Sequence, residues 1–196
     1  MKFITVLLLA LSACIANAAD ANQSTGEVRE KFSPGGFVRF HLSPGGYTIR
    51  SGDSDKIQVT CQATPEQLKE ISVKIRTGSA SADVFISNTP HNNFHAIIEV
   101  PASTGLRVRM FAGEVVIDGV EGDKDVEVSA GRIEIRIPHP EQYGRRDASV
   151  HAGSIEASVF NVSKGGLFRS FEQKGPGKYR LHAHVATGEI QLRGTT

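Results

Sequence analysis

The strongest feature of the chain is an alternation of apolar and polar residues that repeats around four glycines, Gly113, Gly131, Gly153 and Gly188. At one, three and five residues before each glycine, and at two and four residues after it, every position except Thr187 is apolar. Alternation with a period of two is typical of a β-strand with one buried face. The apolar phase shifts by one residue at each glycine. We therefore expect the backbone to bend or bulge there, which favours a residue that is free to adopt a positive φ.

Repeats of roughly 20 residues that each bury one face predict stacked turns of strand, because one turn cannot cover its own apolar side. The predicted fold is all-β, a β-helix or solenoid-like stack of short strands with glycines at the bends. Two Ser-Pro-Gly-Gly phrases, at residues 33–36 and 43–46, predict tight turns between hairpin-like strands before the repeats. Little or no helix is expected, and residues 64–70 are the one segment whose pattern allows a short one.

Two segments interrupt the repeats. Residues 138–147 contain two prolines and are expected to form a small loop, and residues 161–178 are expected to form a longer loop or a cap on one side of the stack.

The first 18 residues have the form of an export signal. Lys2 supplies the positive end, residues 3–15 are apolar, and Ala-Asn-Ala at residues 16–18 is a small-x-small cleavage site. We expect cleavage after Ala18, a flexible leader at residues 19–32 and a single domain at residues 33–196. An overlapping Leu-Ser-Ala-Cys phrase resembles a bacterial lipobox, which would instead place a lipid anchor at Cys14.

Export leaves Cys61 as the one remaining cysteine, so no intrachain disulfide is expected. The apolar run of the signal is too short to span a bilayer, and no transmembrane segment is predicted in the mature chain. The formal net charge is +1, which gives no electrostatic reason to expect binding to nucleic acid or to an anionic membrane.

Paired carboxylates are the first candidate for chemistry. Glu134 and Glu156 both lie three residues after a repeat glycine, so stacking in register would place them in one column on the outer face. Such a pair would suit a polysaccharide lyase or hydrolase. The alternative is a solvated charged column, which we prefer because Arg132 and Arg136 flank Glu134.

Histidines are the second candidate. His182 and His184 point the same way from one strand, and His151 lies on a neighbouring turn. Zinc needs a third and usually a fourth ligand, and His151 and His184 fall in different columns. No nucleophile elbow is present either. The sequence therefore indicates no catalytic residue, no cofactor and no metal site.

An aromatic surface is the third candidate. Phe168, Phe171 and Tyr179 lie in or beside residues 161–178, close to Lys174 and Lys178. Exposed aromatic rings near basic groups could hold a sugar or a partner protein. The competing interpretation is that these rings cover an open end of the stack.

Three further segments carry a family resemblance. Residues 47–53 read Tyr-Thr-Ile-Arg-Ser-Gly-Asp, residues 175–181 read Gly-Pro-Gly-Lys-Tyr-Arg-Leu, and residues 185–192 read Val-Ala-Thr-Gly-Glu-Ile-Gln-Leu. Together with the Pro-Gly-Gly phrases, they make residues 33–196 resemble the bacterial putative adhesin domain family of repeated β-strands. The resemblance implies a β-helix-like stack in the periplasm or at the cell surface, without established catalysis.

The function expected from the sequence is that of an exported, non-enzymatic scaffold or interaction module of the bacterial cell envelope. Its partner would be an envelope protein or glycan. The alternative is a polysaccharide-active solenoid enzyme, which would need a groove lined by acidic side chains. The outer positions of the repeats instead alternate between basic, acidic and neutral residues.

Overall fold

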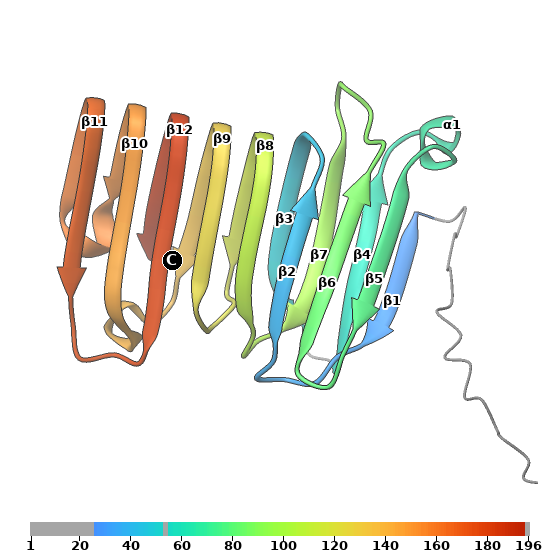
Figure 1. The fold of residues 1–196 in the computed structure, drawn as a ribbon, viewed down its shortest axis with the longest axis horizontal. Coiled ribbons are helices and arrows are strands. Elements are labelled where there is room, and N and C mark those ends of the chain that lie inside the picture. The colour runs from blue at the N-terminus through green and yellow to red at the C-terminus, as the bar shows by residue number, and fades with distance from the viewer. Residues whose placement is uncertain (1–25, 53–54, 195–196) are drawn as a thin grey trace, which may run out of the picture.

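The computed structural model describes residues 26–52 and 55–194, which form a single twelve-stranded mixed sheet (Figure 1). The helical elements are α1 (Pro65–Leu68) and the 3-10 turns Pro140–Gln142 and Ser158–Phe160. The predicted all-β class with little helix is confirmed. The strands are β1 (Glu27–Lys31), β2 (Phe37–Leu42), β3 (Gly45–Gly52), β4 (Lys56–Gln62), β5 (Ser72–Thr77), β6 (Ser81–Ser87), β7 (His95–Pro101), β8 (Gly105–Asp118), β9 (Lys124–Ile137), β10 (Tyr143–Ala157), β11 (Val162–Lys174) and β12 (Tyr179–Gly194).

The repeat glycines lie side by side where four long strands bend. β8, β9, β12 and β10 each fold over at the same end of the molecule in Figure 1. Their glycines pair in the order Gly113, Gly131, Gly188, Gly153, with φ between 128° and 141°. A Cβ atom built on Gly131 would lie 1.9 Å from the carbonyl oxygen of Gly113. The bend therefore excludes every side chain, both by its backbone conformation and by the approach of the next strand.

Each long strand has an arm before its glycine and an arm after it, and the two arms form opposite walls of one core. β2 pairs with the first arm of β8, and β3 pairs with the second arm. Inward side chains from both walls, such as Val128 and Ile133 of β9, are at most 1% exposed and belong to one hydrophobic cluster. Burial of this apolar surface, at about 25 cal/mol per Å², is the main stabilising contribution of the fold.

The order of strands in the sheet differs from their order in the chain. β12, the last strand, lies between β9 and β10 and runs parallel to both. β2 lies between β8 and β6, and β3 lies between β8 and β7. β3 is thus inserted between β7 and β8, and β12 between β9 and β10, although each of these pairs is consecutive in the chain.

Antiparallel strands stand at both ends of the sheet. β11 pairs antiparallel with β10 at one end, and β4, β5 and β1 have antiparallel partners at the other. The expected leader at residues 19–32 is wrong where it contains β1. Residues 161–178, expected as a longer loop or a cap, contain the strand β11 at one end of the sheet, which agrees with a cap and not with a loop. Neither strand shows a clear apolar alternation: β11 has one buried side chain, that of Phe171, and β1 has one, that of Val28. The smaller expected loop, residues 138–147, likewise ends early, since β10 begins at Tyr143.

The predicted short helix is confirmed as α1. Thr64 caps it, since its hydroxyl accepts a hydrogen bond from the Gln67 backbone and the Gln67 side chain accepts one from the Thr64 backbone. Cys61 is buried in β4, and burial raises the pKa of its thiol to about 11, which fits the expectation of a small buried hydrophobe.

The predicted signal peptide, the possible anchor at Cys14 and the first part of the expected leader lie outside the described residues. Among residues 26–52 and 55–194, no helix has the length and apolar character needed to cross a membrane.

Replacing Gly131 by Ala should destabilise the protein by about 3 kcal/mol or more, because the new Cβ meets a backbone oxygen in a conformation that Ala rarely adopts. Chemical denaturation measures the change. Gly165→Ala is the matched control: a Cβ there would lie 3.9 Å from its nearest neighbour, the Gly153 oxygen, and the expected change is within about 0.5 kcal/mol. Equal losses in the two variants would contradict a special requirement at the bend.

Candidate functional site

Rows of polar side chains cross the outer face of the wall formed by the first arms. One row consists of the residues six positions before each bend glycine, and a second row consists of those four positions before it. Because the glycines are in register, each row runs straight across the sheet. The first row, in spatial order, is Arg107, Asp125, His182 and Asp147, and the second is Arg109, Glu127, His184 and Ser149.

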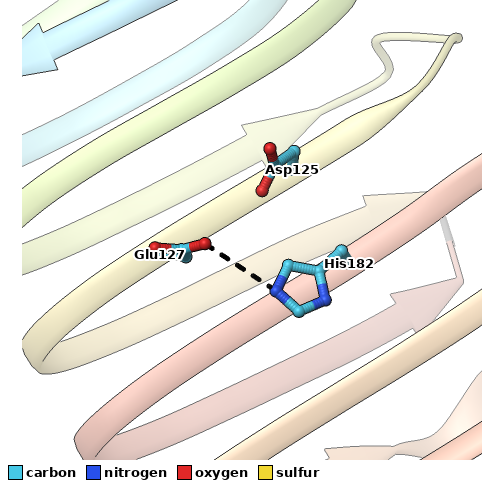
Figure 2. A group of neighbouring side chains, drawn as sticks. All are labelled: Asp125, Glu127 and His182. Atoms are coloured by element: carbon cyan, nitrogen blue, oxygen red, sulfur yellow. Dashed lines mark ion pairs between the residues drawn. The ribbon is translucent and has the colours of Figure 1, made fainter.

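Asp125, Glu127 and His182 come together where β9 and β12 lie side by side, as Figure 2 shows. One ligand atom from each residue lies within 4.8 Å of the others. His182 Nε2 is 4.0 Å from Glu127 Oε1, and His182 Nδ1 is 2.5 Å from Asp147 Oδ2. A proton on Nδ1 is favoured by the Asp147 carboxylate, and it leaves Nε2 as a lone-pair donor directed at the cluster.

Arginines of β8 already neutralise these carboxylates. Arg109 Nη2 lies 2.8 and 2.9 Å from the two oxygens of Asp125 and 3.0 Å from Glu127 Oε1. Arg107 donates a further hydrogen bond of 2.9 Å to Asp125. Burial raises the pKa of Asp125, but the hydrogen bonds from Arg109 and Arg107 outweigh it and hold that pKa below its usual value. A divalent cation would have to displace or sit beside a guanidinium, so the cluster is better suited to pairing charges than to holding a metal ion.

The other histidines continue the cluster towards β10. His184 Nδ1 is 2.8 Å from the Ser149 hydroxyl, and its ring centroid is 4.9 Å from that of His151. Burial, followed by the nearby His151, lowers the pKa of His184. His184 therefore stays neutral at a pH where an isolated histidine would begin to take up a proton.

The expected stack of Glu134 on Glu156 does not occur. Gln191 of β12 lies between them, pairing with Glu134 on one side and with Glu156 on the other. Glu134 is also only 9% exposed, under Arg136, whose Nε donates to it at 3.0 Å. The solvated column expected from the sequence is thus wrong at Glu134, and these two carboxylates are not a neighbouring acid–base pair.

The residues of the expected aromatic surface are placed far apart. Phe168 is 78% exposed near the bend of β11, whereas Phe171 is 8% exposed, with its ring centroid 6.4 Å from that of Phe160. Tyr179, at the start of β12, pairs with Tyr143, at the start of β10. Phe168 lies opposite position 151 of β10. That position is eight residues, or roughly 26 Å, along the strand from Tyr143. The side chains of Lys174 and Lys178 are exposed, and Lys178 Nζ lies 4.6 Å from the centroid of the Tyr179 ring.

A buried lysine is the most unusual titratable group of the core. Lys124 is 2% exposed, and its Nζ donates to the Tyr143 hydroxyl and, at 3.2 Å, to the Gly122 carbonyl. Burial lowers the pKa of Lys124 to about 7, although Glu121 and Asp123 act in the opposite direction. Burial raises the pKa of Tyr143. The amine is not accessible to a substrate, so its consequence is for stability.

His182 was a candidate from the sequence, but its carboxylate neighbours were not. Asp125, His182 and Asp147 all stand six residues before a repeat glycine, so the signal was present in the offsets. It could not be used without knowing that β12 lies between β9 and β10.

Two solved structures align with most of this chain. One is described as a putative cell adhesion protein from Clostridium sporogenes and aligns over 86% of this chain and 99% of that protein, with a TM-score of 0.51 and 16% identity. At that identity the likeness shows a shared fold. A second structure, described as a putative adhesin from Bacteroides fragilis, aligns over 85% and 95% of the two chains, but its TM-score of 0.38 at 10% identity is too low to establish a common fold. No protein-family model and no curated protein matches the chain.

Arg109→Gln should tighten zinc binding at the cluster by roughly tenfold or more, because it removes a positive charge about 3 Å from both carboxylates. Titration calorimetry with ZnCl₂ measures the affinity. Arg50→Gln, which removes the partner of Glu99 in another part of the sheet, is the control and should leave it unchanged. Tight zinc binding by the unaltered protein that is lost in His182→Ala would show that the arginines do not block the cluster.

Lys124→Met should remove a pH dependence of stability between pH 7 and 9. In this window the unfolded chain keeps the lysine proton, whose ordinary pKa is 10.5, and the folded protein has lost it. The unfolded state therefore binds more protons, and the free energy of unfolding rises with pH by up to about 1.4 kcal/mol per pH unit. Below pH 7 both states are protonated and this contribution is constant.

Denaturation curves at several pH values test this expectation. Cys61 and Tyr143, whose pKa values are raised, act in the opposite direction above about pH 9, which is why the window ends there. A stability of the unaltered protein that stays flat or falls from pH 7 to 9, with the Met variant behaving identically, would be incompatible with a neutral buried amine.

Proposed function

We propose that this protein is an exported, non-enzymatic interaction module of the bacterial cell envelope, with an adhesin-like role and a β-solenoid-like fold. Its partner is an envelope protein or a glycan. The main support for the proposal is that acidic side chains on the outer face are paired with arginines of neighbouring strands. The strongest candidate for chemistry, the cluster of Asp125, Glu127 and His182, has its carboxylates bound by Arg107 and Arg109, so it presents neither a free general base nor an open metal site.

The same pairing of charges extends across the sheet. Arg39 forms two hydrogen bonds with Asp83, of 2.6 and 2.8 Å, and Arg50 is 2.5 Å from Glu99 on the opposite wall. A flat surface of paired charges suits recognition of a partner, where complementary charges set specificity and encounter rate more than affinity. An acid–base enzyme would need groups whose protonation is free to change.

Support for the adhesin-like role comes from the protein of shared fold, which is described as a putative cell adhesion protein. The glycine bends, the parallel register of β8, β9, β12 and β10 and the continuous core support the solenoid-like description. The export signal predicted from the sequence of residues 1–18 supports the location, with either a free mature chain or a lipid anchor at Cys14. Of the surface expected from the sequence, we propose the exposed side chains of Phe168, Lys174 and Lys178 as separate partner contacts. Tyr179 supports Lys178, and Phe171 is buried and contributes through packing.

Cell fractionation combined with intact mass measurement tests the location. The full chain, expressed in a bacterium, should be found outside the cytoplasm and should begin at Ala19. A lipid-modified chain that is lost in Cys14→Ala would select the anchored alternative. Retention of the full-length chain in the cytoplasm would contradict the proposal.

Retention of the mature chain on immobilised envelope fractions tests the interaction. Binding should be saturable and should be lost in Val128→Asp, which places a charge in the core and unfolds the protein. The polysaccharides recovered from the assay should be unchanged in length. Equal retention of Val128→Asp, or shortening of a polysaccharide that stops in Glu134→Gln, would argue against a non-enzymatic binding module.

A further inference from the structure

The end of the sheet formed by β11 carries a pocket, and of its lining residues only Phe168 was expected from the sequence to contact a ligand. Within residues 26–52 and 55–194, β11 is the last strand of the sheet and pairs with β10 alone. Beside its bend lies a pocket of about 390 Å³, a volume within the range of small-molecule sites. Its lining residues are Lys164, Gly165, Phe168, Arg169 and Ser170.

Phe168 is unusual in both exposure and backbone conformation. Its side chain is 78% exposed, and its φ of 50° is in the left-handed region, which is unfavourable for a bulky residue. Each property costs free energy, and a residue such as Gly or Asn would remove both costs. Strained residues of this kind concentrate at ligand sites, where the strain holds a group in its binding position.

Two basic side chains hold the bend in this shape. Lys164 Nζ donates to the carbonyl of Ser170 at 2.7 Å, and Arg169 Nε donates to the carbonyl of Gly165 at 3.0 Å. The two bonds cross the turn and preorganise the pocket. They also occupy carbonyls near the end of the sheet, and charged residues on an edge strand oppose pairing with another strand. The bend of β11 is therefore a poor place for a second copy of this chain to add a strand.

The pocket is positively charged. Lys164 and Arg169 both retain N–H groups beyond those used on the backbone, and none of the described residues that line the pocket carries a carboxylate. The carboxylate of Glu156 on β10 accepts a hydrogen bond from Ser163 instead. The imidazole ring of His151 lies beside the pocket, with its centroid 5.9 Å from that of Phe168.

We infer that this pocket binds an acidic sugar residue of the uronic-acid type, as found in charged polysaccharides. The apolar C–H face of the sugar ring packs on Phe168, and its carboxylate pairs with Lys164 and Arg169. The inference rests on the proposed interaction function and names its ligand class. A planar aromatic contact beside two cations distinguishes this ligand from a neutral glycan, for which the charges would have no partner.

Calorimetric titration of the mature chain with digalacturonate, and with its methyl ester as the uncharged match, tests the inference. The acid should bind at least tenfold more tightly than the ester, and the binding should weaken as NaCl is raised. Arg169→Gln should lower the affinity for the acid roughly tenfold and leave the weak binding of the ester unchanged.

Phe168→Gly is the second variant, because it removes the ring and relaxes the positive φ together. Binding should fall roughly tenfold while the melting temperature stays the same or rises, which a merely structural phenylalanine would not show. Phe111→Ala is the matched control. The Phe111 ring, on β8, is also exposed, at 72%. It lies at the same level of the sheet as Phe168 but four strand spacings away, which is about 19 Å. It should leave the affinity unchanged.

Four outcomes would overturn the inference: no binding of digalacturonate, equal binding of acid and ester, equal losses in Phe111→Ala and Phe168→Gly, or a dimer joined through β11 that binds no sugar. The retention assay on envelope fractions distinguishes failure of the sugar pocket from failure of the proposed interaction function. If Phe168→Gly is retained on envelope fractions as well as the unaltered protein, the interaction function stands and the sugar pocket does not. If neither protein is retained, both fail.

Discussion

The close approach of backbones at the glycine bends determines the arrangement of the whole stack. At Gly113, Gly131, Gly153 and Gly188, a Cβ atom would come within 1.7 to 2.0 Å of the carbonyl oxygen of the neighbouring glycine. The backbone of the next strand occupies the space that a side chain would need, so each of these four bends requires a glycine. A slip of one residue would bring side chains into that space and would turn every apolar residue outward. The bends thereby set one register for both walls.

That shared register is what made part of the structure predictable. Within a strand, the distance of a residue from its glycine gives its row and its face, so the inward positions of β8, β9, β10 and β12 could be assigned from the sequence. The same offsets occur around Gly45, with Leu42 and Phe40 before it and Tyr47 and Ile49 after it, and Gly45 pairs with Gly113. The residue directly before the glycine is small in the other four repeats but is Pro44 here, so the pattern around Gly45 was not recognised as a further repeat.

The order of strands could not be predicted in the same way, because neighbouring repeats present almost identical bends and apolar edges to one another. Nothing in the spacing of the glycines distinguishes β10 from β12 as the neighbour of β9. β11 was missed for a different reason: it covers one end of the sheet, with one buried side chain, that of Phe171, and so carries no alternation. The candidate site was the least predictable part, since its carboxylates lie on β9 and its histidine on β12, and their contact depends on the order of the strands.

Outer-face charge gives a physical reason for the observed order. Stacking in chain order would place β10 against β9, with Asp147 opposite Asp125 on one wall and Glu156 opposite Glu134 on the other. Like charges directly opposite one another are destabilising in a sheet. With β12 inserted, His182 separates the first pair and Gln191 the second, while Arg107 and Arg109 of β8 approach Asp125 from the other side. The glycines make the strands interchangeable in shape, and the polar rows favour one arrangement among them. The cluster that resembles a metal site is then explained by its part in selecting the neighbours of β9.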